Sequence, residues 1–461
     1  MGLLPLTSSL VVVAEAQTPD LSGTWITHET ELQLYEVEAT EAGPATTVFD
    51  RFALNSDSLE IKSGNSSTVG DERFQFVFDN GILVPVTDEG PLALGLSEEI
   101  DTVIRSGVED VPLDISRFRR FEFEVGIRRP SGVFSVNALA GRWISLRQTM
   151  ITLQSPELRD EVFVGAYQEV DQIDLRPDGH FHFENLSATS SFQTEEPFNG
   201  TWQPAGTGVT LSAGGETLSL ADISAGGDTA LWLETEVFEN GGSQNIDQSY
   251  SILIRETPAL EPSDVIGSWA FSMQRLNSYG DSAGFDQQFL GSQFEFGRIE
   301  LLPDGRITGV ILAASEPSTS LSEVTWSIEG NQLKFEEPGE PSLRLRVSAG
   351  HDFAAGLSFE ERPFFLSGKE QEYGIVTACK LPKTARLFPA PTRLLAEGPV
   401  AVCAGSQVGV FYQLERSSDL LTWTAVGSPV EGTGAEICAQ DPSFPSGKAF
   451  YRWRVVLSPS P

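Results

Sequence analysis

Cysteine, methionine and histidine are scarce in this sequence of 461 residues, which has three, three and four of them respectively. All three cysteines lie after residue 378 and none forms a Cys-x-x-Cys pair, which argues against a disulfide scaffold and a cysteine-based metal site. After the N-terminal segment no apolar run reaches the roughly 18 residues of a membrane-spanning helix. No stretch of about 12 residues has a convincing helical period. The chain is therefore expected to be neither helical nor membrane-spanning.

Positive charge is also in short supply. The 30 Lys and Arg residues stand against 65 Asp and Glu residues, which gives a formal charge of −35. Nucleic acid and anionic lipid would be repelled, so neither is expected as a partner. We interpret the acidity as a means of solubility. A Gly-rich phosphate loop, paired catalytic carboxylates at a readable spacing and an EF-hand-type calcium loop are missing, so no cofactor is expected.

The N-terminal segment MGLLPLTSSLVVVAEAQ has the apolar stretch and the Ala14-Glu15-Ala16 ending of a cleaved signal peptide, although Lys and Arg are missing near Met1. Residues 1–16 are thus predicted to be a signal peptide, and the mature chain to begin near Gln17. A buried N-terminal strand is the alternative. Export predicts a secreted or periplasmic protein, or one displayed at the cell surface.

What the sequence does contain is a repeat built on tryptophan. Gly-x-Trp occurs three times, and the last two copies continue alike. In each, a Pro-Asp-Gly turn places its Asp 35 residues after the tryptophan, and a second tryptophan and a closing strand-like run follow. These shared landmarks indicate an internal duplication. The motif residues are Gly23, Trp25, Gly141, Trp143, Trp202, Gly267, Trp269 and Trp326.

The duplicated units are predicted to span residues 139–257 and 265–380. The first Gly-x-Trp starts a diverged unit within 17–130 that lacks the Pro-Asp-Gly turn and the second tryptophan. Within the units apolar and polar residues alternate, as in QIDLRPDGHFHFENL (172–186), where a turn separates the two strands of a half-buried hairpin. The fold class is therefore predicted to be all-β and antiparallel.

This order of landmarks resembles bacterial lipocalin-like domains, strongly over 139–380 and weakly over 21–130. Gly141 and Trp143, like Gly267 and Trp269, match the opening motif of that family residue by residue. The resemblance implies tandem small antiparallel β-barrels of about eight strands, each plugged at one end by the tryptophan. It names no ligand. Such a barrel either holds one small apolar ligand or is filled by its own side chains, and both alternatives stay open.

Residues 393–461 resemble the fibronectin type III-like C-terminal modules of secreted proteins from Verrucomicrobia-like and planctomycete-like bacteria. The resemblance implies a β-sandwich that displays or spaces the other domains. Cys403 and Cys438 fall in this segment and are predicted to form a disulfide after export, which leaves Cys379 unpaired. The residues that carry the resemblance are Leu414, Ser417, Asp419, Leu420, Trp423, Asp441, Phe450, Tyr451 and Arg452.

One catalytic motif is present. The segment GDSAG (280–284) matches the Gly-x-Ser-x-Gly elbow of α/β-hydrolases, and His351 follows its Ser282 in the chain. The elbow requires a strand before the serine and a helix after it, whereas an alternating, strand-like segment follows here. We interpret the segment as a loop between strands and the chain as a non-enzyme, with an esterase using Ser282 as a remote alternative.

Three other polar features have plain interpretations. His180 and His182 would share one face of a strand, but two ligands without a third make a weak metal site, so we interpret both as solvent-facing. The acidic run HETELQLYEVEATEAG (28–43) is interpreted as a solvated strand face. Asp79-Asn80-Gly81 is typical of a type I′ turn. No metal site and no ligand-binding residues are assigned.

The sequence thus predicts an exported, non-catalytic binding protein of three lipocalin-like units and a C-terminal sandwich. Its partner would be a small hydrophobic ligand inside a barrel, or an extracellular protein or glycan at the outer surface. In the alternative, filled barrels serve as a structural or adhesive scaffold at the cell surface.

Overall fold

The structure is a computed structural model of the chain. In the part that it describes, no helix is long and apolar enough to cross a membrane. The predicted signal peptide, Ser282 and the Asn80-Gly81 pair lie outside the described residues. The described residues are 23–37, 46–62, 66–69, 72–79, 82–86, 94–99, 101–112, 116–154, 161–190, 196–240, 242–257, 259–280, 287–315, 323–363, 368–381, 393–395, 401–405, 411–417, 424–431, 436–441 and 450–456.

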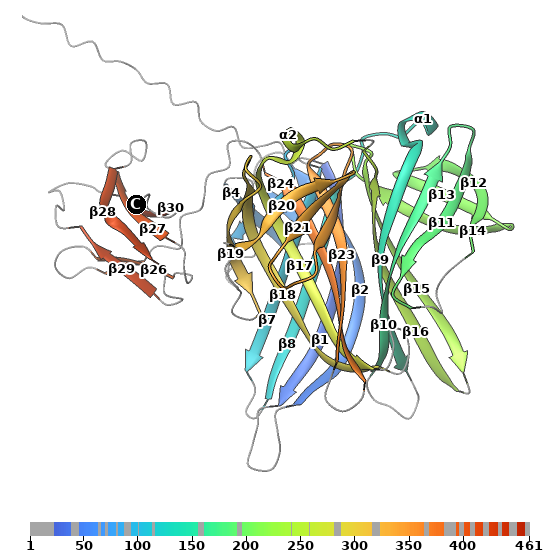
Figure 1. The fold of residues 1–461 in the computed structure, drawn as a ribbon, viewed down its shortest axis with the longest axis horizontal. Helices are drawn as coiled ribbons and strands as arrows, with labels where there is room; N and C mark the ends of the chain where they lie inside the picture. The colour runs from blue at the N-terminus through green and yellow to red at the C-terminus, as the bar shows by residue number, and fades with distance from the viewer. Residues whose placement is uncertain are drawn as a thin grey trace, which may run out of the picture. The chain divides into compact units, whose positions relative to one another are not determined.

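Two compact units make up the chain: residues 21–385, and residues 1–20 together with 386–461. The unit of residues 21–385 contains three eight-stranded antiparallel sheets (Figure 1). In the first two, barrels 1 and 2, each strand pairs with its neighbours in sequence and the last strand pairs with the first. The third sheet, barrel 3, curls in the same order, and its seam is bridged at Arg306 and Thr325. The predicted all-β class with small antiparallel barrels is confirmed.

The strands are longest where each barrel begins and ends. Barrel 1 consists of β1 (Gly23–Val37), β2 (Thr46–Lys62), β3 (Ser66–Val69), β4 (Glu72–Asp79), β5 (Ile82–Val86), β6 (Leu94–Leu96), β7 (Thr102–Pro112) and β8 (Ser116–Arg128). Helix α1 (Val136–Leu139) precedes barrel 2, which consists of β9 (Gly141–Gln154), β10 (Val162–Leu175), β11 (His180–Ala188), β12 (Phe198–Ala205), β13 (Gly208–Ala213), β14 (Glu216–Ile223), β15 (Thr229–Asn240) and β16 (Ser243–Arg255). Helix α2 (Pro262–Val265) precedes barrel 3, which consists of β17 (Gly267–Gly280), β18 (Gln288–Leu301), β19 (Ile307–Ala314), β20 (Thr325–Glu329), β21 (Gln332–Glu336), β22 (Leu343–Val347), β23 (Phe353–Pro363) and β24 (Lys369–Lys380).

The Pro-Asp-Gly hairpins form as predicted. Between β10 and β11 the Arg176 amide donates to the His180 carbonyl oxygen over 2.8 Å, and Gly179 has a φ of +81°. The turn between β18 and β19 repeats this geometry, with Gly305 at a φ of +82°. Glycine adopts a positive φ without the steric cost that other residues meet, so the sequence fixes both turns locally.

Both faces of the first strand of a barrel are buried, each against a different core. In barrel 3, Trp269, Phe271 and Met273 of β17 pack in the interior with side chains from the other strands of the same sheet. Leu276 lies at the opposite parity and belongs to a second apolar core that all three barrels share. The period of two therefore separates the barrel interior from the contact between barrels, and not the interior from solvent.

The three barrels surround a common axis at which equivalent residues meet. The long strands of all three lie side by side there (Figure 1). The residues seven positions after the three motif tryptophans are Leu32, Met150 and Leu276, and all three belong to the shared core. The residues five positions after the tryptophans are Thr30, Gln148 and Gln274. These six side chains line one cavity of about 10 Å³. We call this line the pseudo-threefold axis.

Polar side chains also tie the barrels together. Thr30 of barrel 1 donates from Oγ1 to Oε1 of Gln274 in barrel 3 over 3.0 Å. Gln168 of barrel 2 donates from Nε2 to the Gly374 carbonyl oxygen of barrel 3 over 2.9 Å. Buried amides that are satisfied by another barrel fix the relative register of the barrels, because moving them apart would leave those groups unpaired. The three barrels thus form one body.

The second unit contains two three-stranded sheets. One has the order β25 (Arg393–Leu395), β26 (Ala401–Gly405), β29 (Glu436–Gln440), and the other the order β28 (Thr424–Glu431), β27 (Phe411–Ser417), β30 (Phe450–Val456). Leu414 and Asp441 are fully buried, and Arg416 donates to Asp441 over 2.7 Å. Asp419, Leu420 and Trp423 lie outside the described residues.

The predicted disulfide has a compatible backbone. Cys403 of β26 and Cys438 of β29 lie directly opposite each other in the antiparallel register. A directly opposed pair in such a ladder has its Cα atoms about 4.5–5.5 Å apart, within the range that a disulfide spans. The bond itself stays a prediction.

Candidate functional site

The Gly-x-Trp motifs close one end of the barrels, which we call the proximal end. Trp143 and Trp269 are buried, and their Nε1 atoms donate to the carbonyl oxygens of Leu139 (3.0 Å) and Val265 (2.8 Å) at the ends of α1 and α2. Trp25 is buried at the matching position of β1. Trp143 and Trp269 therefore plug their barrels and hold a short helix across them, and Trp25 is buried at the equivalent place in barrel 1.

A basic residue at the end of the closing strand lies over the motif glycine in all three barrels, with Arg128 over Gly23 in barrel 1. Arg255 runs over Gly141 and donates from Nη1 to the Ala138 carbonyl oxygen over 2.5 Å. Lys380 lies over Gly267 in the same way and donates to the backbone of α2. Both glycines have a φ above +130°, which other residues rarely adopt. The closing strands were visible in the sequence. The contact of their last residue with a glycine about 110 residues earlier in the chain was not.

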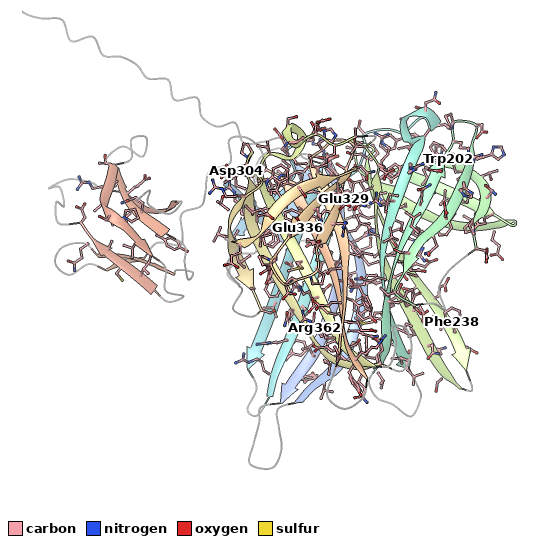
Figure 2. The ribbon with its side chains drawn as sticks, in the orientation of Figure 1. Trp202, Phe238, Asp304, Glu329, Glu336 and Arg362 are labelled. Carbon is pink, nitrogen blue, oxygen red and sulfur yellow. The ribbon has the colours of Figure 1, made fainter. Side chains whose placement is uncertain are left out.

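The second tryptophans close the hairpin turns. Trp202 donates from Nε1 to the Arg176 carbonyl oxygen over 2.9 Å, and Trp326 donates to that of Leu302 over 3.0 Å. Each indole thus satisfies a backbone acceptor at the first residue of a Pro-Asp-Gly turn. Trp202 marks the proximal end in Figure 2. Their role in the structure is to hold the turn to the barrel.

The proximal half of barrel 2 is filled by its own side chains. The cavity inside it has a volume of about 20 Å³ and a wholly apolar lining. A cavity needs roughly 10–15 Å³ to hold one water molecule, so this space is far too small for a lipid or a drug-sized ligand. Its lining consists of Trp143, Ile173, Leu175, Val209, Leu211, Ala221, Ile223, Ala230, Trp232 and Leu253.

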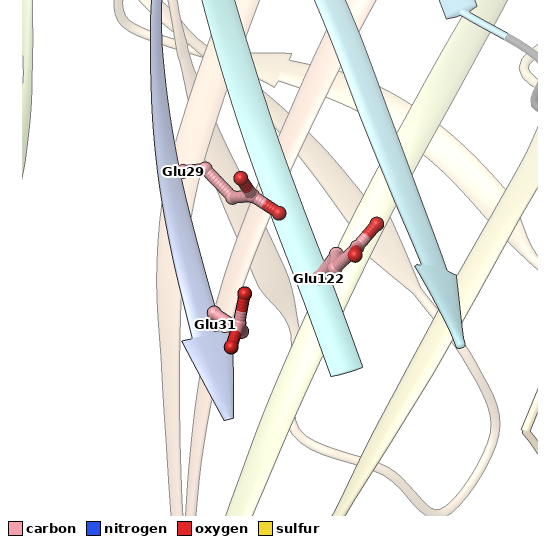
Figure 3. A group of neighbouring side chains, drawn as sticks. All are labelled: Glu29, Glu31 and Glu122. Atoms are coloured by element: carbon pink, nitrogen blue, oxygen red, sulfur yellow. The ribbon is translucent and has the colours of Figure 1, made fainter. Parts of the chain in front are cut away.

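The interior of barrel 1 is acidic, contrary to the interpretation of residues 28–43 as a solvated strand face. Leu32 and Leu34 of β1 face the shared core, so Glu29 and Glu31, at the opposite parity, face into the barrel. Glu122 of β8 lies opposite Glu31 in the register, and Figure 3 shows the three carboxyl groups converging. The expectation was wrong because both faces of β1 are covered, a fact that alternation alone cannot reveal.

Burial and crowding make these carboxyl groups hard to ionise. The pKa of Glu29 is raised to about 8, first by burial and then by the negative charges of Glu122 and Glu124. Burial also raises the pKa of Glu124, against the opposing charge of Arg105. Glu29 is therefore largely protonated at neutral pH, which reduces the repulsion within the group.

The group could bring one oxygen each from Glu29, Glu31 and Glu122 within 4.8 Å of one another. However, Glu122 already pairs with Arg105 through one oxygen and with Arg120 through the other, the latter at 3.0 Å. A divalent cation would have to displace both guanidinium groups. The arrangement is therefore an ion network that holds protons and charge inside the barrel, and it carries no metal proposal.

Barrel 2 has a related network below its apolar half. The Arg147 guanidinium lies 5.1 Å from the centre of the Trp232 ring and 3.6 Å from the Glu169 carboxylate. Asp247 lies on β16, the strand that pairs with β9, which carries Arg147. The pKa of Asp247 is raised to about 6, first by burial and then by the negative charge of Glu236. Two barrels thus combine an apolar or plugged proximal end with ionisable groups in the interior, which no motif in the sequence indicated.

Ser282 lies outside the described residues, and the described residue nearest before it lies far along β24 from the residues next to His351. Phe353, two residues after His351, lies opposite Cys379 of β24, whereas Gly280, two residues before Ser282, lies opposite Lys369. Ten residues of β24 separate these positions, which is roughly 34 Å along a strand. A serine nucleophile must lie within hydrogen-bonding reach of its base.

His351 has other neighbours. Its Nδ1 lies 3.6 Å from Asp264 Oδ1, and its Nε2 lies 3.4 Å from Thr257 Oγ1. We expect the Ser282→Ala variant to hydrolyse p-nitrophenyl acetate at the same background rate as the wild-type protein. A rate that drops on this substitution would revive the esterase.

The paired histidines behave as strand residues. His180 and His182 alternate along β11 with the buried Phe181 and Phe183. His180 lies 3.4 Å from Asp178, and His182 contacts Asn199 over 3.1 Å. Their partners are neighbouring turn and strand side chains, as expected for an exposed hairpin face.

Large apolar side chains are exposed at the other end of barrels 1 and 2, the distal end. Phe238 marks it in Figure 2, far from Trp202. The exposed fractions range from 36% to 52%. Val237 and Phe238 are consecutive residues of β15, so their side chains point to opposite faces of the sheet. We call this set the distal rim: Tyr35, Val48, Val162, Val237 and Phe238.

Comparisons with known proteins place few limits on the chain. No protein family matches it, and no curated protein is detectably similar in sequence. A solved structure of a transferrin-binding protein B variant, a vaccine antigen from Haemophilus parasuis, is 8% identical with a TM-score of 0.22, over 80% of this chain and 77% of that chain. Transferrin-binding protein B of isotype 1 from serogroup B Neisseria meningitidis is 10% identical with a TM-score of 0.20, over 78% and 77%. At these values we infer nothing from them about this chain.

Proposed function

We propose that this chain is an exported, non-catalytic interaction protein whose three barrels serve as one rigid scaffold. The observation that carries the proposal is the filled proximal half of barrel 2, where the cavity of about 20 Å³ leaves no room for an apolar ligand. In barrel 3 the interior core likewise includes large side chains such as Trp269, Phe271 and Trp326. With the interior of barrel 3 and the proximal half of barrel 2 occupied by their own side chains, we assign partner binding to the outer surface.

The shared axial core supports the scaffold part of the proposal. Leu32, Met150 and Leu276 pack in one cluster although they belong to three barrels. Such packing suppresses motion between the barrels, so surfaces on different barrels keep a fixed spacing. The distal rim, with Val237 and Phe238 exposed by about half, is the surface that we assign to partner contact.

The class of partner follows from charge and compartment. With a formal charge of −35, a polyanionic partner is disfavoured, which leaves extracellular protein and neutral or basic glycan. Export and the fibronectin type III-like role of residues 393–461 are parts of the same proposal. They are supported by the signal-like N-terminus and by the two three-stranded sheets of the second unit.

Native mass spectrometry of residues 17–461, purified without detergent, tests this function. We expect the native mass to equal that of the chain, and to remain so after incubation with a mixture of lipids and hydrophobic metabolites, because barrels 2 and 3 are filled. The denatured protein provides the reference mass. Bound mass that disappears on denaturation would instead show a hollow, occupied barrel and would overturn the scaffold proposal in favour of a ligand carrier.

A further inference from the structure

Three aspartates from three barrels form a closed ring around the pseudo-threefold axis at the proximal end. Each ends a five-residue turn of the form Ser-x-x-x-Asp, and each accepts a hydrogen bond from the serine of its own turn. All six side chains are at most 5% exposed. We call Asp101, Asp228 and Asp352 the aspartate ring, and their turn serines are Ser97, Ser224 and Ser348.

The second oxygen of each aspartate binds the next barrel in a cycle. Asp101 Oδ2 accepts from the backbone amide of Gly226 in barrel 2 over 3.1 Å. Asp228 Oδ2 accepts from the amide of Gly350 in barrel 3 over 2.7 Å. Asp352 Oδ2 accepts from the amide of Glu99 in barrel 1 over 3.4 Å and closes the cycle. Every barrel is thus both donor and acceptor.

The close approach explains two of the turn residues. A Cβ on Gly226 would lie 2.7 Å from Asp101 Oδ2, and a Cβ on Gly350 would lie 2.7 Å from Asp228 Oδ2, both too close for another residue. The third turn has Glu99 at this position, and its contact with Asp352 is the longest of the three. The ring is therefore weakest between barrels 3 and 1.

The groups that face the ring offer few positive charges. The groups acting on Asp101 and Asp352 are the other ring carboxyls, serine and threonine hydroxyls and backbone amides. The buried Cys379 thiol of β24 is next to them, and its pKa is raised by burial and then by Asp352 and Asp101. Of the basic side chains at this end, Arg255 and Lys380 donate to carbonyl oxygens near α1 and α2, and Arg129 pairs with Asp222. His351, in the turn of barrel 3, contacts Asp264.

We propose that the aspartate ring is a proton-controlled joint, which holds the proximal ends of the three barrels together while Asp101 and Asp352 carry protons and loosens them when these two carboxyl groups ionise. Ionised carboxyl groups buried around one axis repel one another, and the hydroxyls and amides that donate to Asp101 and Asp352 offset burial and repulsion only in part. The pKa of Asp352 is accordingly raised to about 7, by burial first and then by Asp101 and Asp228, and that of Asp101 is also raised.

Hydrogen exchange of the intact chain, followed by mass spectrometry at pH 5.5 and 8.5, tests the joint. After correction for the intrinsic rate, we expect peptides covering residues 94–99, 224–228 and 348–352 to open on the order of 30-fold more often at pH 8.5. That factor follows from a carboxyl with a pKa of about 7 in the closed ring and about 4 in the open one. Equal protection at both pH values would overturn the proposal.

The Asp352→Asn variant separates the ring from the other buried carboxyl groups. Its amide keeps an acceptor for the Glu99 amide but carries no charge, so at pH 8.5 the variant should show the protection of the wild-type protein at pH 5.5. Asp178→Asn, in an exposed turn at the same end, is the matched control and should behave as wild type. A pH dependence unchanged by Asp352→Asn would overturn the proposal, and Asp101→Asn takes its place if that variant does not fold.

Discussion

The protein is expected to lose stability as the pH rises from 6 to 9. Glu29 and Asp352 have pKa values raised to about 8 and about 7, and in the unfolded chain they would titrate near 4. Between these values the native state binds more protons than the unfolded state, so the free energy of unfolding falls as the pH rises through the folded pKa values.

Below about pH 6.5, a buried histidine changes the stability in the opposite direction. The pKa of His28 is lowered to about 4 by burial, against the attraction of Asp222. The unfolded chain then binds this proton from about pH 6.5 downward while the native state does not, so stability is lost as the pH falls from about 6.5 to 4. The two effects oppose each other between about pH 4 and 6.5, so the loss caused by the carboxyl groups is unopposed only above about pH 6.5.

Thermal unfolding monitored by tryptophan fluorescence at pH 6 and pH 9 measures the effect. We expect a midpoint about 5 °C higher at pH 6, given the few degrees per kcal/mol of a domain this large. In the Glu29→Gln variant the difference should shrink, since the charge that is costly at pH 9 is gone. The exposed Glu239→Gln is the control. A midpoint that rises from pH 6 to pH 9 would contradict the raised pKa values.

The Leu276→Ala variant is expected to destabilise all three barrels and not barrel 3 alone. Leu276 is buried on the pseudo-threefold axis and packs in one core with Leu32 and Met150. Removing a buried leucine costs about 2–5 kcal/mol in the free energy of unfolding, depending on how far the site collapses. Because the lost contacts belong to three barrels, the loss is shared by one cooperative body.

Denaturant-dependent hydrogen exchange shows whether the barrels respond together. We expect peptides from β8, β16 and β24 to lose protection at the same, lower denaturant concentration in Leu276→Ala. The control is Leu186→Ala, where the leucine is 42% exposed and the change should be close to neutral. If only β24 and its barrel shifted, the shared core would not couple the barrels and the rigid-scaffold proposal would lose its basis.

Local rules were enough for the hairpins and for the repeat. The Pro-Asp-Gly turns depend on a positive φ at Gly179 and Gly305, and glycine at that place is visible in the sequence. Trp143 and Trp269 showed the duplication through their spacing alone. The first barrel lacks the turn and the second tryptophan, yet it closes with eight strands because closure depends on strand number and stagger and not on those landmarks.

What covers each face of a strand could not be predicted from the sequence. Alternation along β1 shows that Glu29 and Leu32 point to opposite sides, but it does not say what covers either side. The acidic face of β1 was expected to be exposed to water. It lies inside barrel 1 instead, because barrels 2 and 3 cover the apolar face of the strand. The sequence by itself determined the strands, the turns and the repeat, since these follow from nearest neighbours and period. Only the tertiary structure decided that Asp101, Asp228 and Asp352 meet, because three turns more than a hundred residues apart become neighbours when three barrels pack around one axis.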